Sequence, residues 1–307
     1  MTDSPATPAP TRSGRVALLG RPNVGKSTLL NALLGEPIAI ISSHPQTTRD
    51  VVRGVLTRGD TQYVFLDTPG VHSAKNRLGT MMNEAARGQA READVVVLLV
   101  EPEWGPDQNA GDLALAKELD GVPVVLVINK IDRLKDKTKL LPILAAFSEK
   151  HAFAATVPMS AKRADGTERL LKELRELLPE QPFLYEPDTL SDQPVRFFVA
   201  EFVREQILQH TRQEVPHGVA VVVERFDESS DVPHIELAIH VAREGHKGIL
   251  VGAKGNMMKR IGTAARMRVE KMLGRKVHLK LWVRTSPDWM NDPAKLRDLG
   301  YGPESTR

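Results

Sequence analysis

The sequence predicts an α/β protein of two domains: a larger domain built on a mostly parallel sheet, then a smaller α+β domain. In the first half of the chain, near-continuous apolar runs alternate with helical patterns, as in a parallel sheet covered on both faces. Residues 178–187 contain three prolines in ten positions, which excludes a helix or a central strand and indicates a linker. A glycine-rich segment at residues 20–27, between an expected strand and an expected helix, is the third observation.

The first domain should contain a sheet with helices between its strands. We expect strands at residues 15–19, 51–57, 62–66, 95–100, 122–128 and 156–159, and helices at residues 28–34, 76–91, 107–119, 139–151 and 167–178. Arg58-Gly59-Asp60 is typical of a hairpin turn between the second and third strands. Ligands of such sheets bind at the carboxyl ends of strands, and the motifs described below follow strands.

The second domain should have the element order α-β-β-α-α-β. The corresponding residues are 195–210, 218–226, 234–241, a short helix from 247 to 250, 256–273 and 277–283. We expect four methionines and Trp282 in the core of this domain, and Trp289 to anchor the segment that follows it. The methionines are Met257, Met258, Met267 and Met272.

Composition excludes several classes of protein. The hydrophobic content of 41% and charged content of 26% are ordinary for a globular chain. There is no cysteine, so disulfides and thiolate metal or redox sites are excluded. Residues 1–14 are rich in Pro, Thr, Ser and Ala, lack an apolar signal core, and are expected to be a disordered tail. No apolar run approaches the roughly 20 residues that span a bilayer, so a cytosolic location is expected.

The segment Gly20-Arg21-Pro22-Asn23-Val24-Gly25-Lys26-Ser27, followed by Thr28, fits the phosphate-binding pattern GxxxxGK[ST]. Its glycines let the backbone bend round a polyphosphate with N–H groups facing inward. Lys26 can reach the β- and γ-phosphates, and the Ser27 hydroxyl can bind Mg²⁺. A glycine-rich turn that binds nothing is the alternative, which the flanking strand and helix disfavour.

Three further motifs follow strands. Asp67-Thr68-Pro69-Gly70 offers a carboxylate for Mg²⁺ through water and the Gly70 N–H for a γ-phosphate. In Asn129-Lys130-Ile131-Asp132, the Asp132 carboxylate can accept hydrogen bonds from guanine N1–H and its 2-amino group, while Asn129 and Lys130 brace the base pocket. Ser160-Ala161-Lys162 could present a backbone N–H to guanine O6. Each motif alone could be an ordinary turn, but their joint order predicts binding of GTP and GDP.

The loop at residues 42–50 and the segment after Gly70 should be the nucleotide-sensing switch regions. Thr48 is our first choice for completing the Mg²⁺ shell and sensing the γ-phosphate, and Thr47 is the alternate. Both could instead be ordinary loop threonines. Position 71 holds valine, which cannot hydrogen-bond to the attacking water. His72 could orient water, although a surface loop histidine is the simpler interpretation.

These motifs together resemble the translation-factor-related class of GTPases, within the group that includes Era. The resemblance implies a hydrophobic residue at position 71, a different route to hydrolysis, and a slow reaction without a partner. It also implies that Asn23 helps to bind a K⁺ ion beside the phosphates. The residues expected to act in hydrolysis are Lys26, Thr48, Gly70 and Asn23.

A GxxG loop with a basic surround lies in the second domain. Residues 245–284 contain eleven Lys or Arg and one acid, whereas the rest of the chain is mildly acidic. Within this window, two glycines flank a tip at which Lys254 can meet phosphate, beside a groove that can read single-stranded bases. Motif, charge and element order together are similar to a type II KH domain. The expected RNA contacts are Gly252, Ala253, Lys254, Gly255, Lys259 and Arg260.

The whole order of parts resembles the Era family after residue 14, as do Val199-Ala-Glu-Phe-Val-Arg-Glu-Gln-Ile-Leu208 and Glu214-Val-Pro-His217. The resemblance implies binding of small-subunit (16S) ribosomal RNA near its 3′ end and a role in assembly of the small ribosomal subunit. It also implies peripheral association with the inner face of the membrane, and no DNA partner is expected. We expect a tail at 1–14, a GTPase domain at 15–178, a linker at 179–194, a KH domain at 195–285 and a C-terminal tail at 286–307.

Three alternatives stay open from the sequence. A tRNA-modification GTPase shares Asn23 and the Thr-Thr-Arg-Asp loop, but a KH module argues against it. A non-catalytic RNA-binding scaffold that holds nucleotide structurally is compatible with Val71. A P-loop kinase or ATPase is disfavoured by Asp132.

Overall fold

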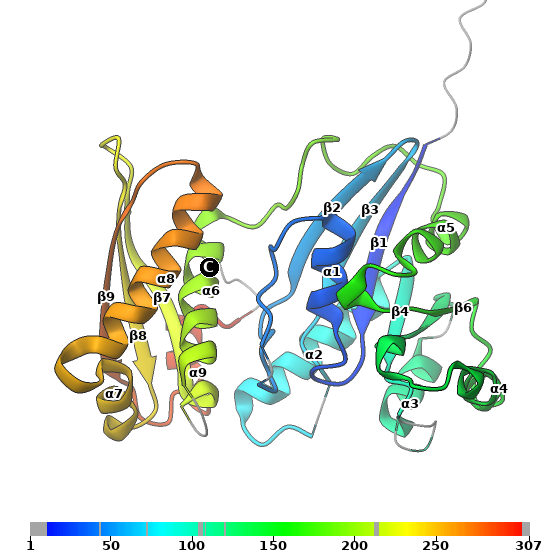
Figure 1. Ribbon diagram of the computed structural model, residues 1–307, viewed down its shortest axis with the longest axis horizontal. Coiled ribbons are helices and arrows are strands. Elements are labelled where there is room, and N and C mark those ends of the chain that lie inside the picture. Colours follow the sequence, from blue (N-terminus) through cyan, green and yellow to red (C-terminus); the bar gives the residue numbers. More distant parts are fainter. Residues whose placement is uncertain are drawn as a thin grey trace, which may run out of the picture. The chain divides into compact units, whose positions relative to one another are not determined.

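The computed structural model describes residues 11–42, 44–71, 73–103, 107, 109–119, 121–211 and 215–302, and Figure 1 shows its ribbon. The chain divides into two compact units. Unit 1 contains Met1–Ala39, Val51–Val71 and Glu84–Asp192, and unit 2 contains Ile40–Asp50, His72–Asn83 and Gln193–Arg307. Two short segments from the first half of the chain therefore group with the C-terminal third, a division that the linear domain boundaries at 178 and 195 did not anticipate.

Unit 1 is built on a six-stranded sheet with the order β2-β3-β1-β4-β5-β6. Its strands are β1 (Arg12–Leu19), β2 (Val52–Arg58), β3 (Thr61–Asp67), β4 (Val95–Val100), β5 (Val124–Ile128) and β6 (Ala155–Pro158). The hairpin of β2 and β3 is antiparallel and every other pairing is parallel, which confirms the mostly parallel sheet. Because β1 lies between β3 and β4, the ends of three strands meet beside the glycine-rich segment.

Helices cover both faces of this sheet. They are α1 (Lys26–Leu34), α2 (Arg77–Glu92), α3 (Ala110–Glu118), α4 (Leu140–Ser148) and α5 (Thr167–Leu177), and short 3₁₀ turns lie at η1 (Ile131–Arg133), η2 (Lys137–Lys139) and η3 (Ala161–Arg163). Ala17 and Leu19 of β1 face a core that includes Ala86, Leu113 and Phe147, from α2, α3 and α4. Successive strand residues point to opposite faces, which leaves the other face for α1 and α5.

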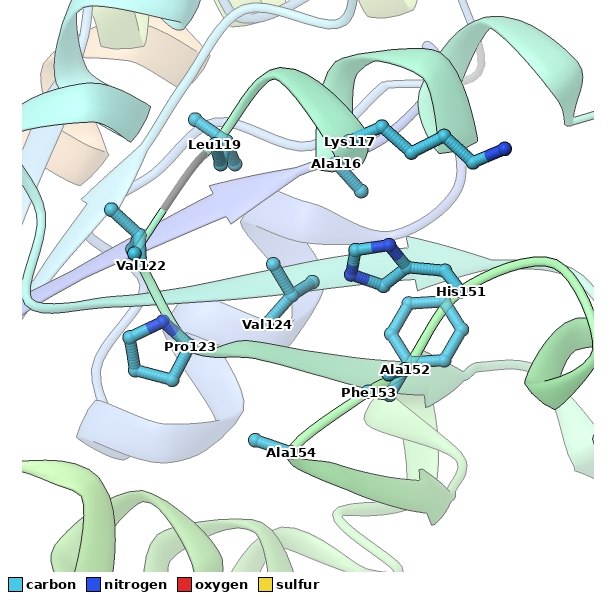
Figure 2. Close-up of a pocket in the computed structure, with 11 residues that line it drawn as sticks. Ala116, Lys117, Leu119, Val122, Pro123, Val124, His151, Ala152, Phe153 and Ala154 are labelled. Carbon is cyan, nitrogen blue, oxygen red and sulfur yellow. The ribbon is translucent and has the colours of Figure 1, made fainter.

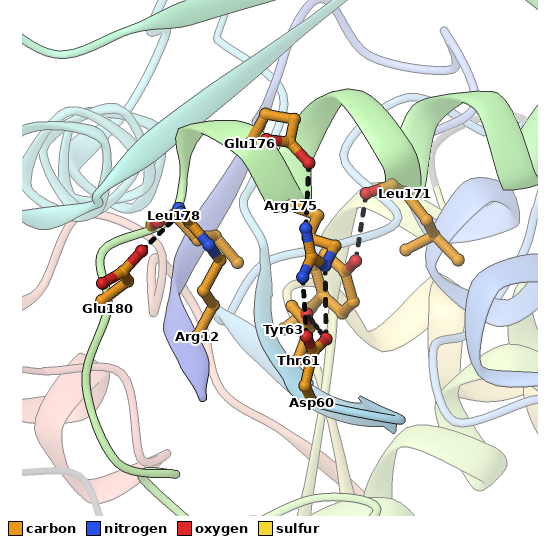
Figure 3. Close-up of polar contacts among 9 residues, drawn as sticks. All are labelled: Arg12, Asp60, Thr61, Tyr63, Leu171, Arg175, Glu176, Leu178 and Glu180. Carbon is orange, nitrogen blue, oxygen red and sulfur yellow. Dashed lines mark hydrogen bonds and ion pairs between the residues drawn. The ribbon is translucent and has the colours of Figure 1, made fainter. Parts of the chain in front are cut away.

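The two ends of unit 1 are fastened together. Strand β1 begins at Arg12, three residues before the expected start, because its backbone pairs with Thr61 of β3 and Arg12 bonds to the carbonyl of Leu178. The expected disordered tail at 1–14 is therefore wrong for residues 12–14, and residues 1–10 lie outside the described part. The Arg175 guanidinium on α5 donates to the Asp60 carboxylate in the hairpin turn at 2.6 Å (Figure 3).

The proline-rich linker is attached to the sheet rather than extending freely. The Val55 N–H on β2 donates to the carbonyl of Leu190 at 2.8 Å, and the Gln62 amide donates to the carbonyl of Tyr185 at 2.8 Å. Strand β2 is one of the two edge strands of the sheet, and an uncovered edge is prone to pairing with other chains. The linker thus protects this edge, and unit 1 extends to Asp192.

Unit 2 contains a three-stranded sheet in the order β7-β8-β9. The elements are α6 (Val195–His210), η4 (Pro216–Gly218), β7 (Val219–Asp227), β8 (His234–Val241), α7 (Glu244–Val251), η5 (Ala253–Gly255), α8 (Asn256–Leu273), β9 (His278–Thr285) and α9 (Pro293–Asp298). The predicted order α-β-β-α-α-β is confirmed, and α9 is an addition that the sequence pattern did not indicate.

Trp289 is buried and donates its indole N–H to the carbonyl of Gly218, which confirms that it anchors the C-terminal tail. The expected core position is wrong for Met267 and Met272, whose side chains lie on the exposed side of α8. It is also wrong for Trp282, which is half-buried between the cations of β9. None of the helices in the described part of the chain combines the length and apolar character that a bilayer crossing requires.

Candidate functional site

The glycine-rich segment forms a tight loop between β1 and α1. A Cβ atom at Gly20 would lie 2.4 Å from the carbonyl oxygen of Leu99, so only glycine fits there. Gly25 has a φ of 108°, and a Cβ atom there would lie 2.3 Å from the side-chain nitrogen of Asn129. Helix α1 begins directly after Gly25 with no side-chain cap. Its first N–H groups and the loop amides form the nest that binds phosphate in such folds.

Lys26 and Ser27 are held at the mouth of this loop. The Lys26 ammonium donates to the carbonyls of Gly20 at 2.9 Å and Arg21 at 3.1 Å, and its side chain is buried. The Ser27 hydroxyl donates to a carboxylate oxygen of Asp67 at 2.6 Å. Hydroxyl and carboxylate oxygens are the ligands that Mg²⁺ accepts beside phosphate oxygens, so this pair fits the ion. Among the described residues, no three His, Asp or Glu side chains gather to hold a metal by themselves.

The Asp-Thr-Pro-Gly motif closes against the loop. The Thr68 hydroxyl donates to the carbonyl of Leu18 at 2.7 Å and fixes the end of β3 to β1. A Cβ atom at Gly70 would lie 2.7 Å from the backbone nitrogen of Pro22, so Gly70 touches the phosphate loop. Val71 packs against the core under α2 and α3, which removes it from any role in orienting water.

The base-reading motif is joined to the phosphate loop by hydrogen bonds. The Asn129 amide donates to the carbonyl of Val24 at 2.8 Å, and its oxygen accepts from the Ala161 N–H at 2.9 Å. The Lys130 ammonium donates to the carbonyl of Asn23 at 2.7 Å. Asn129 therefore connects three predicted motifs, which the structure brings together in unit 1.

Asp132 is positioned as an acceptor. It lies in η1 just after β5, and the Ser160 hydroxyl donates to one of its oxygens at 2.6 Å. This hydrogen bond holds the pKa of Asp132 below its usual range, so the group is an ionised carboxylate at neutral pH. Lys162 lies on the exposed side of η3, and Thr28 is half-buried in the first turn of α1.

Glu101 is a site residue that the motif search missed. Its buried carboxylate follows β4 and accepts a hydrogen bond from Lys130 at 2.6 Å. The partner charge fixes the lysine beside the expected base pocket. The available signal was an acidic residue at the carboxyl end of a fully buried strand, which is the place where the other motifs lie.

A separate hollow of about 450 Å³ lies at the other end of β5, and Figure 2 shows its lining. Val124 begins the strand at this hollow, whereas Asn129 follows its last residue. Five strand residues span about 17 Å, so the hollow is no part of the nucleotide site. The rings of His151 and Phe153 meet edge-on in it, at 4.8 Å between centroids.

The two candidate switch threonines lie in unit 2, whereas the nucleotide motifs lie in unit 1. Thr47 is buried, and its hydroxyl donates to the carbonyl of His44 at 2.6 Å. Thr48 is half-buried. The structure does not bring these residues together with the phosphate loop in one unit, so the choice of Thr48 for Mg²⁺ stays a prediction. His72 lies outside the described residues.

The GxxG loop connects α7 and α8 in unit 2. Gly252 and Gly255 have φ angles of 69° and 76°, and Lys254 between them has a φ of 52°. A Cβ atom at Gly252 would lie 2.7 Å from Cβ of Met257, so this glycine lets the loop pack closely. Lys254 is exposed, and α8 begins with uncapped N–H groups directly after Gly255. This arrangement suits a phosphate of a nucleic-acid backbone.

Ion pairing offsets part of the positive charge of this region but not the charge at the loop. Several cations of the basic window pair with carboxylates outside it, so the local charge is lower than the sequence count indicates. These pairs include Arg268–Glu205, Arg275–Glu228, Lys280–Glu236 and Arg284–Glu224. In the described part of the chain, Lys254, Lys259 and Arg260 make no ion pair, so their charge faces solvent beside the loop. Ile249, 52% exposed, adds an apolar surface on α7 near the loop.

Residues 15–130 match the family model for the 50S ribosome-binding GTPase, and residues 214–290 match that for the KH domain. GTPase Era of Ruminiclostridium cellulolyticum is 43% identical over 293 residues, which are 94% of this chain and 97% of the relative. Era of Geobacter metallireducens is 44% identical over 294 residues, covering 95% of this chain and 98% of the relative. The chain belongs to the Era family of GTPases.

Solved Era structures match the chain over almost its whole length. Era of Aquifex aeolicus, a variant bound to GDP and AlF₄⁻, matches with a TM-score of 0.92 and 38% identity, over 95% of this chain and all of that one. A second Era structure, in complex with MgGDPNP and nucleotides 1506–1542 of 16S ribosomal RNA, matches with a TM-score of 0.91 and 38% identity, over 95% of this chain and 99% of that one. The chain is therefore a GTP-binding and GTP-hydrolysing enzyme with a C-terminal KH domain, as the sequence predicted.

Proposed function

We propose that this GTPase is a switch that binds small-subunit ribosomal RNA near its 3′ end and acts in assembly of the small ribosomal subunit. The observation that carries the proposal is the 38% identical Era structure, which holds MgGDPNP and nucleotides 1506–1542 of 16S ribosomal RNA. The exposed GxxG loop with three uncompensated cations beside it supports the RNA half of the proposal. DNA is not an expected partner, because RNA is the ligand of the relative.

Each nucleotide motif has a role in this proposal. The loop at residues 20–27 holds the phosphates, with Lys26 neutralising charge on the β- and γ-phosphates. Ser27, Asp67 and Thr48 would hold Mg²⁺ directly or through water, and the bound ion would supply positive charge beside the phosphate oxygens. The Gly70 N–H meets the γ-phosphate. Asp132 accepts from guanine N1–H and its 2-amino group. The segment Ser160-Ala161-Lys162 supplies a backbone N–H for guanine O6, although the N–H of Ala161 donates to Asn129 in this structure.

The attacking water needs a partner that position 71 does not supply. Val71 packs into the core, so hydrolysis depends on groups that neutralise the γ-phosphate rather than on a glutamine. We propose that a K⁺ ion, bound with the help of Asn23, supplies part of that neutralisation. Asn23 has a φ of 64°, in the left-handed region, so the phosphate loop turns sharply at this residue.

We also propose domain limits and a location for this protein. The expected GTPase domain at 15–178 and KH domain at 195–285 contain or overlap the two matched regions at 15–130 and 214–290. We propose a cytoplasmic protein that associates peripherally with the inner face of the membrane. Flotation of the purified protein with anionic vesicles, with and without GTP, tests the membrane association, and complete recovery at the bottom of the gradient would oppose it.

The experiment that tests the function is GTP hydrolysis in K⁺ buffer, with and without an oligonucleotide of the 16S ribosomal RNA 3′ end. We expect stimulation of at least about 5-fold, the lower end of common coupling between sites. Lys254→Glu should abolish stimulation without changing the basal rate, while Lys150→Glu, at an exposed position just after α4 in unit 1, serves as the matched charge control. Tight binding of both ligands without stimulation would oppose coupling between the two modules.

Nucleotide specificity separates this function from the alternatives. In a P-loop kinase or ATPase, ATP would displace bound GTP. Adenine has no donors where guanine has N1–H and its 2-amino group, so the Asp132 carboxylate should prevent ATP from displacing GTP here. A scaffold that holds nucleotide only structurally would show no turnover even on an assembling small subunit. A tRNA-modification GTPase is disfavoured by the KH domain match.

A further inference from the structure

Arg49 follows the expected Mg²⁺ ligand Thr48 and is buried in unit 2, with 4% of its surface exposed. Its guanidinium donates to the carbonyls of Pro216 at 3.2 Å and His217 at 3.0 Å, and also to the carbonyl of Val219. These carbonyls belong to the turn formed by residues 216–219, which consists of η4 and the first residue of β7. A loop residue from the first half of the chain is therefore inserted into the start of the KH sheet.

Trp289 takes the remaining carbonyl of the same turn. Its indole N–H donates to the carbonyl of Gly218 at 3.1 Å, and the Arg49 guanidinium lies 5.7 Å from the centre of its ring. The Tyr301 ring stacks on the Trp289 ring, with 5.7 Å between their centroids. The Arg49 guanidinium donates to the Tyr301 hydroxyl at 3.4 Å. Arg49 and the C-terminal tail together therefore donate to all four carbonyls of the turn.

The buried charge of Arg49 is held by dipoles rather than by an acid. Among the described residues, no carboxylate lies within ion-pair distance of Arg49, and its Nε has no hydrogen-bond partner. Burial lowers the pKa of Arg49, with a smaller contribution from the neighbouring charge of Arg204. A buried cation without its hydrogen bonds is strongly unfavourable. The guanidinium therefore depends on these carbonyls for as long as it stays buried.

The backbone is fastened on both sides of Thr48. Arg204 on α6, oriented by Glu201 at 2.8 Å, donates to the backbone carbonyl of Thr47. Arg49 fixes the residue on the other side. Thr48 cannot change position without moving at least one of these two buried arginine contacts.

The turn also connects to the helix before the GxxG loop. The Ala242 N–H, just after β8, donates to the carbonyl of Gly218 at 3.1 Å. A Cβ atom at Gly218 would lie 3.4 Å from Nδ1 of His246, so this helix residue packs on the turn. A hollow of about 220 Å³ adjoins them, and the buried Nδ1 of His246 has no partner among the described residues. Helix α7 therefore has space beside the turn, and it ends where the Gly252 loop begins.

We propose that Arg49 is the positioning residue through which the position of Thr48 is transmitted to α7 and its GxxG loop. The inference rests on the proposed function in one respect, namely that Thr48 moves with the bound nucleotide. When Thr48 moves, Arg49 leaves or enters the carbonyl turn, the turn shifts at Gly218, and α7 moves against the hollow. The C-terminal tail takes part because Trp289 shares the turn with Arg49.

The first test needs no RNA. Hydrogen exchange of the amides in residues 246–251 is measured with GDP and with a non-hydrolysable GTP analogue, in the full-length chain. We expect a nucleotide-dependent change of at least about 5-fold in the native chain and less than about 2-fold in Arg49→Met. Arg53→Met is the matched control, because Arg53 is 45% exposed, pairs with Asp192 in unit 1 and should keep the native response. A full response in Arg49→Met, or none in the native chain, would overturn the proposal.

Two further variants keep the test decisive if Arg49→Met does not fold. Arg49→Lys keeps the charge but cannot serve three carbonyls with a planar fork, so it should also lose the response. Trp289→Phe keeps the aromatic packing but removes the donor to Gly218, so it should reduce the response without abolishing it. A native response in both folded variants would contradict the role of the turn.

The RNA readout separates this inference from the proposed function. The ratio of RNA dissociation constants in GDP and in the GTP analogue should fall from at least about 5 to about 1 in Arg49→Met, with nucleotide affinity in the absence of RNA unchanged. A ratio of 1 in the native chain together with a nucleotide response of α7 would refute the coupling to RNA while supporting Arg49. A ratio that survives Arg49→Met would support the proposed function and refute Arg49.

Discussion

The side-chain nitrogen of Asn129 lies 2.8 Å from the carbonyl oxygen of Val24, and this hydrogen bond ties the base-reading motif to the phosphate loop. The oxygen of the same amide accepts from Ala161 N–H at 2.9 Å. One buried amide thus holds three loops that are more than 30 residues apart in the chain. The nucleotide site is therefore a single hydrogen-bonded assembly.

Replacing Asn129 by alanine should weaken GDP and GTP binding by about 100-fold or more, because both neighbouring loops lose their shared anchor. Two backbone groups would lose their partners, so the free energy of unfolding should fall by about 2–4 kcal/mol. Isothermal titration with GDP and urea unfolding measure the two effects.

Asn31 provides the control for this change. Its side chain makes the same pair of bonds, to the carbonyl and N–H of Ala39, at 2.8 and 2.9 Å. Asn31→Ala should therefore lose similar stability and keep its affinity for GDP. Equal loss of affinity in both variants would show that stability, rather than the site, explains the effect of Asn129.

Gly25→Ala should abolish nucleotide binding. The new Cβ atom would lie 2.3 Å from the Asn129 side chain, at a φ of 108° that residues other than glycine rarely adopt. Gly35→Ala is the control, because Gly35 also has a positive φ, of 73°, but nothing lies within 4 Å of its added Cβ. This variant should lose about 1 kcal/mol of stability and bind GDP normally. Normal GDP binding by Gly25→Ala would contradict the close packing of the loop.

Asp132→Asn should exchange guanine for xanthine as the preferred base. The amide can accept from N1–H but offers a donor where guanine also has one, whereas xanthine has a carbonyl there. Affinity for GDP should fall by about 100-fold and affinity for xanthosine diphosphate should rise, as competition with a fluorescent nucleotide would measure. Asp136→Asn, at the exposed cap of η2, should change neither. Unaltered preference in Asp132→Asn would remove Asp132 from base recognition.

GTP hydrolysis should be faster in K⁺ than in Na⁺ at equal ionic strength, by at least about 5-fold if the cation neutralises γ-phosphate charge. Asn23→Ala should remove most of that difference while GDP affinity changes little. The measurement is phosphate release under single-turnover conditions. Equal rates of the native chain in both salts would rule out the use of K⁺.

Tyr63→Phe should change stability in a pH-dependent way. The Tyr63 hydroxyl donates to the carbonyl of Leu171 at 3.0 Å (Figure 3), and its loss should cost about 1 kcal/mol at pH 7. Burial raises the pKa of Tyr63 to about 12, whereas an unfolded tyrosine titrates near 10. The folded state favours the neutral phenol, so this stabilisation is complete below pH 10 and is lost as pH rises towards 12.

Urea unfolding of both proteins between pH 7 and pH 11 measures this difference. The gap between native chain and Tyr63→Phe should shrink above pH 10, because phenylalanine does not titrate. A gap that stays constant up to pH 11 would show that Tyr63 is not held in its neutral form.

Local patterns were sufficient for most of the fold. The apolar runs located β4 at Val95–Val100 without error, and α6 and α8 at Val195–His210 and Asn256–Leu273, because buried strands and amphipathic helices carry their own periodicity. Helix α9 was missed because its six residues are too few to show a period. The prediction that Met267 lies in the core was wrong, because nothing in the neighbouring sequence shows which face of the helix is covered.

The nucleotide motifs were found for a different reason. Phosphate and guanine recognition require particular groups at fixed spacing, as in Lys26 and Asp132, and those groups follow strand ends. Glu101 carries the same signal but no fixed motif, so only its hydrogen bond to Lys130 disclosed it. The charge of the basic window was overestimated, since pairing such as Arg268–Glu205 joins residues that are far apart in the chain.

The sequence by itself determined the order of strands and helices, the phosphate and base motifs, the GxxG loop and the family. These properties depend on neighbouring residues or on short fixed spacings, which can be read along the chain. Only the tertiary structure decided that the segment Ile40–Asp50 belongs to unit 2, that Asn129 joins three loops, and that Arg49 and Trp289 share one turn. Such contacts join residues as many as 170 positions apart, and their energy comes from burial and shared carbonyls, which no local pattern contains.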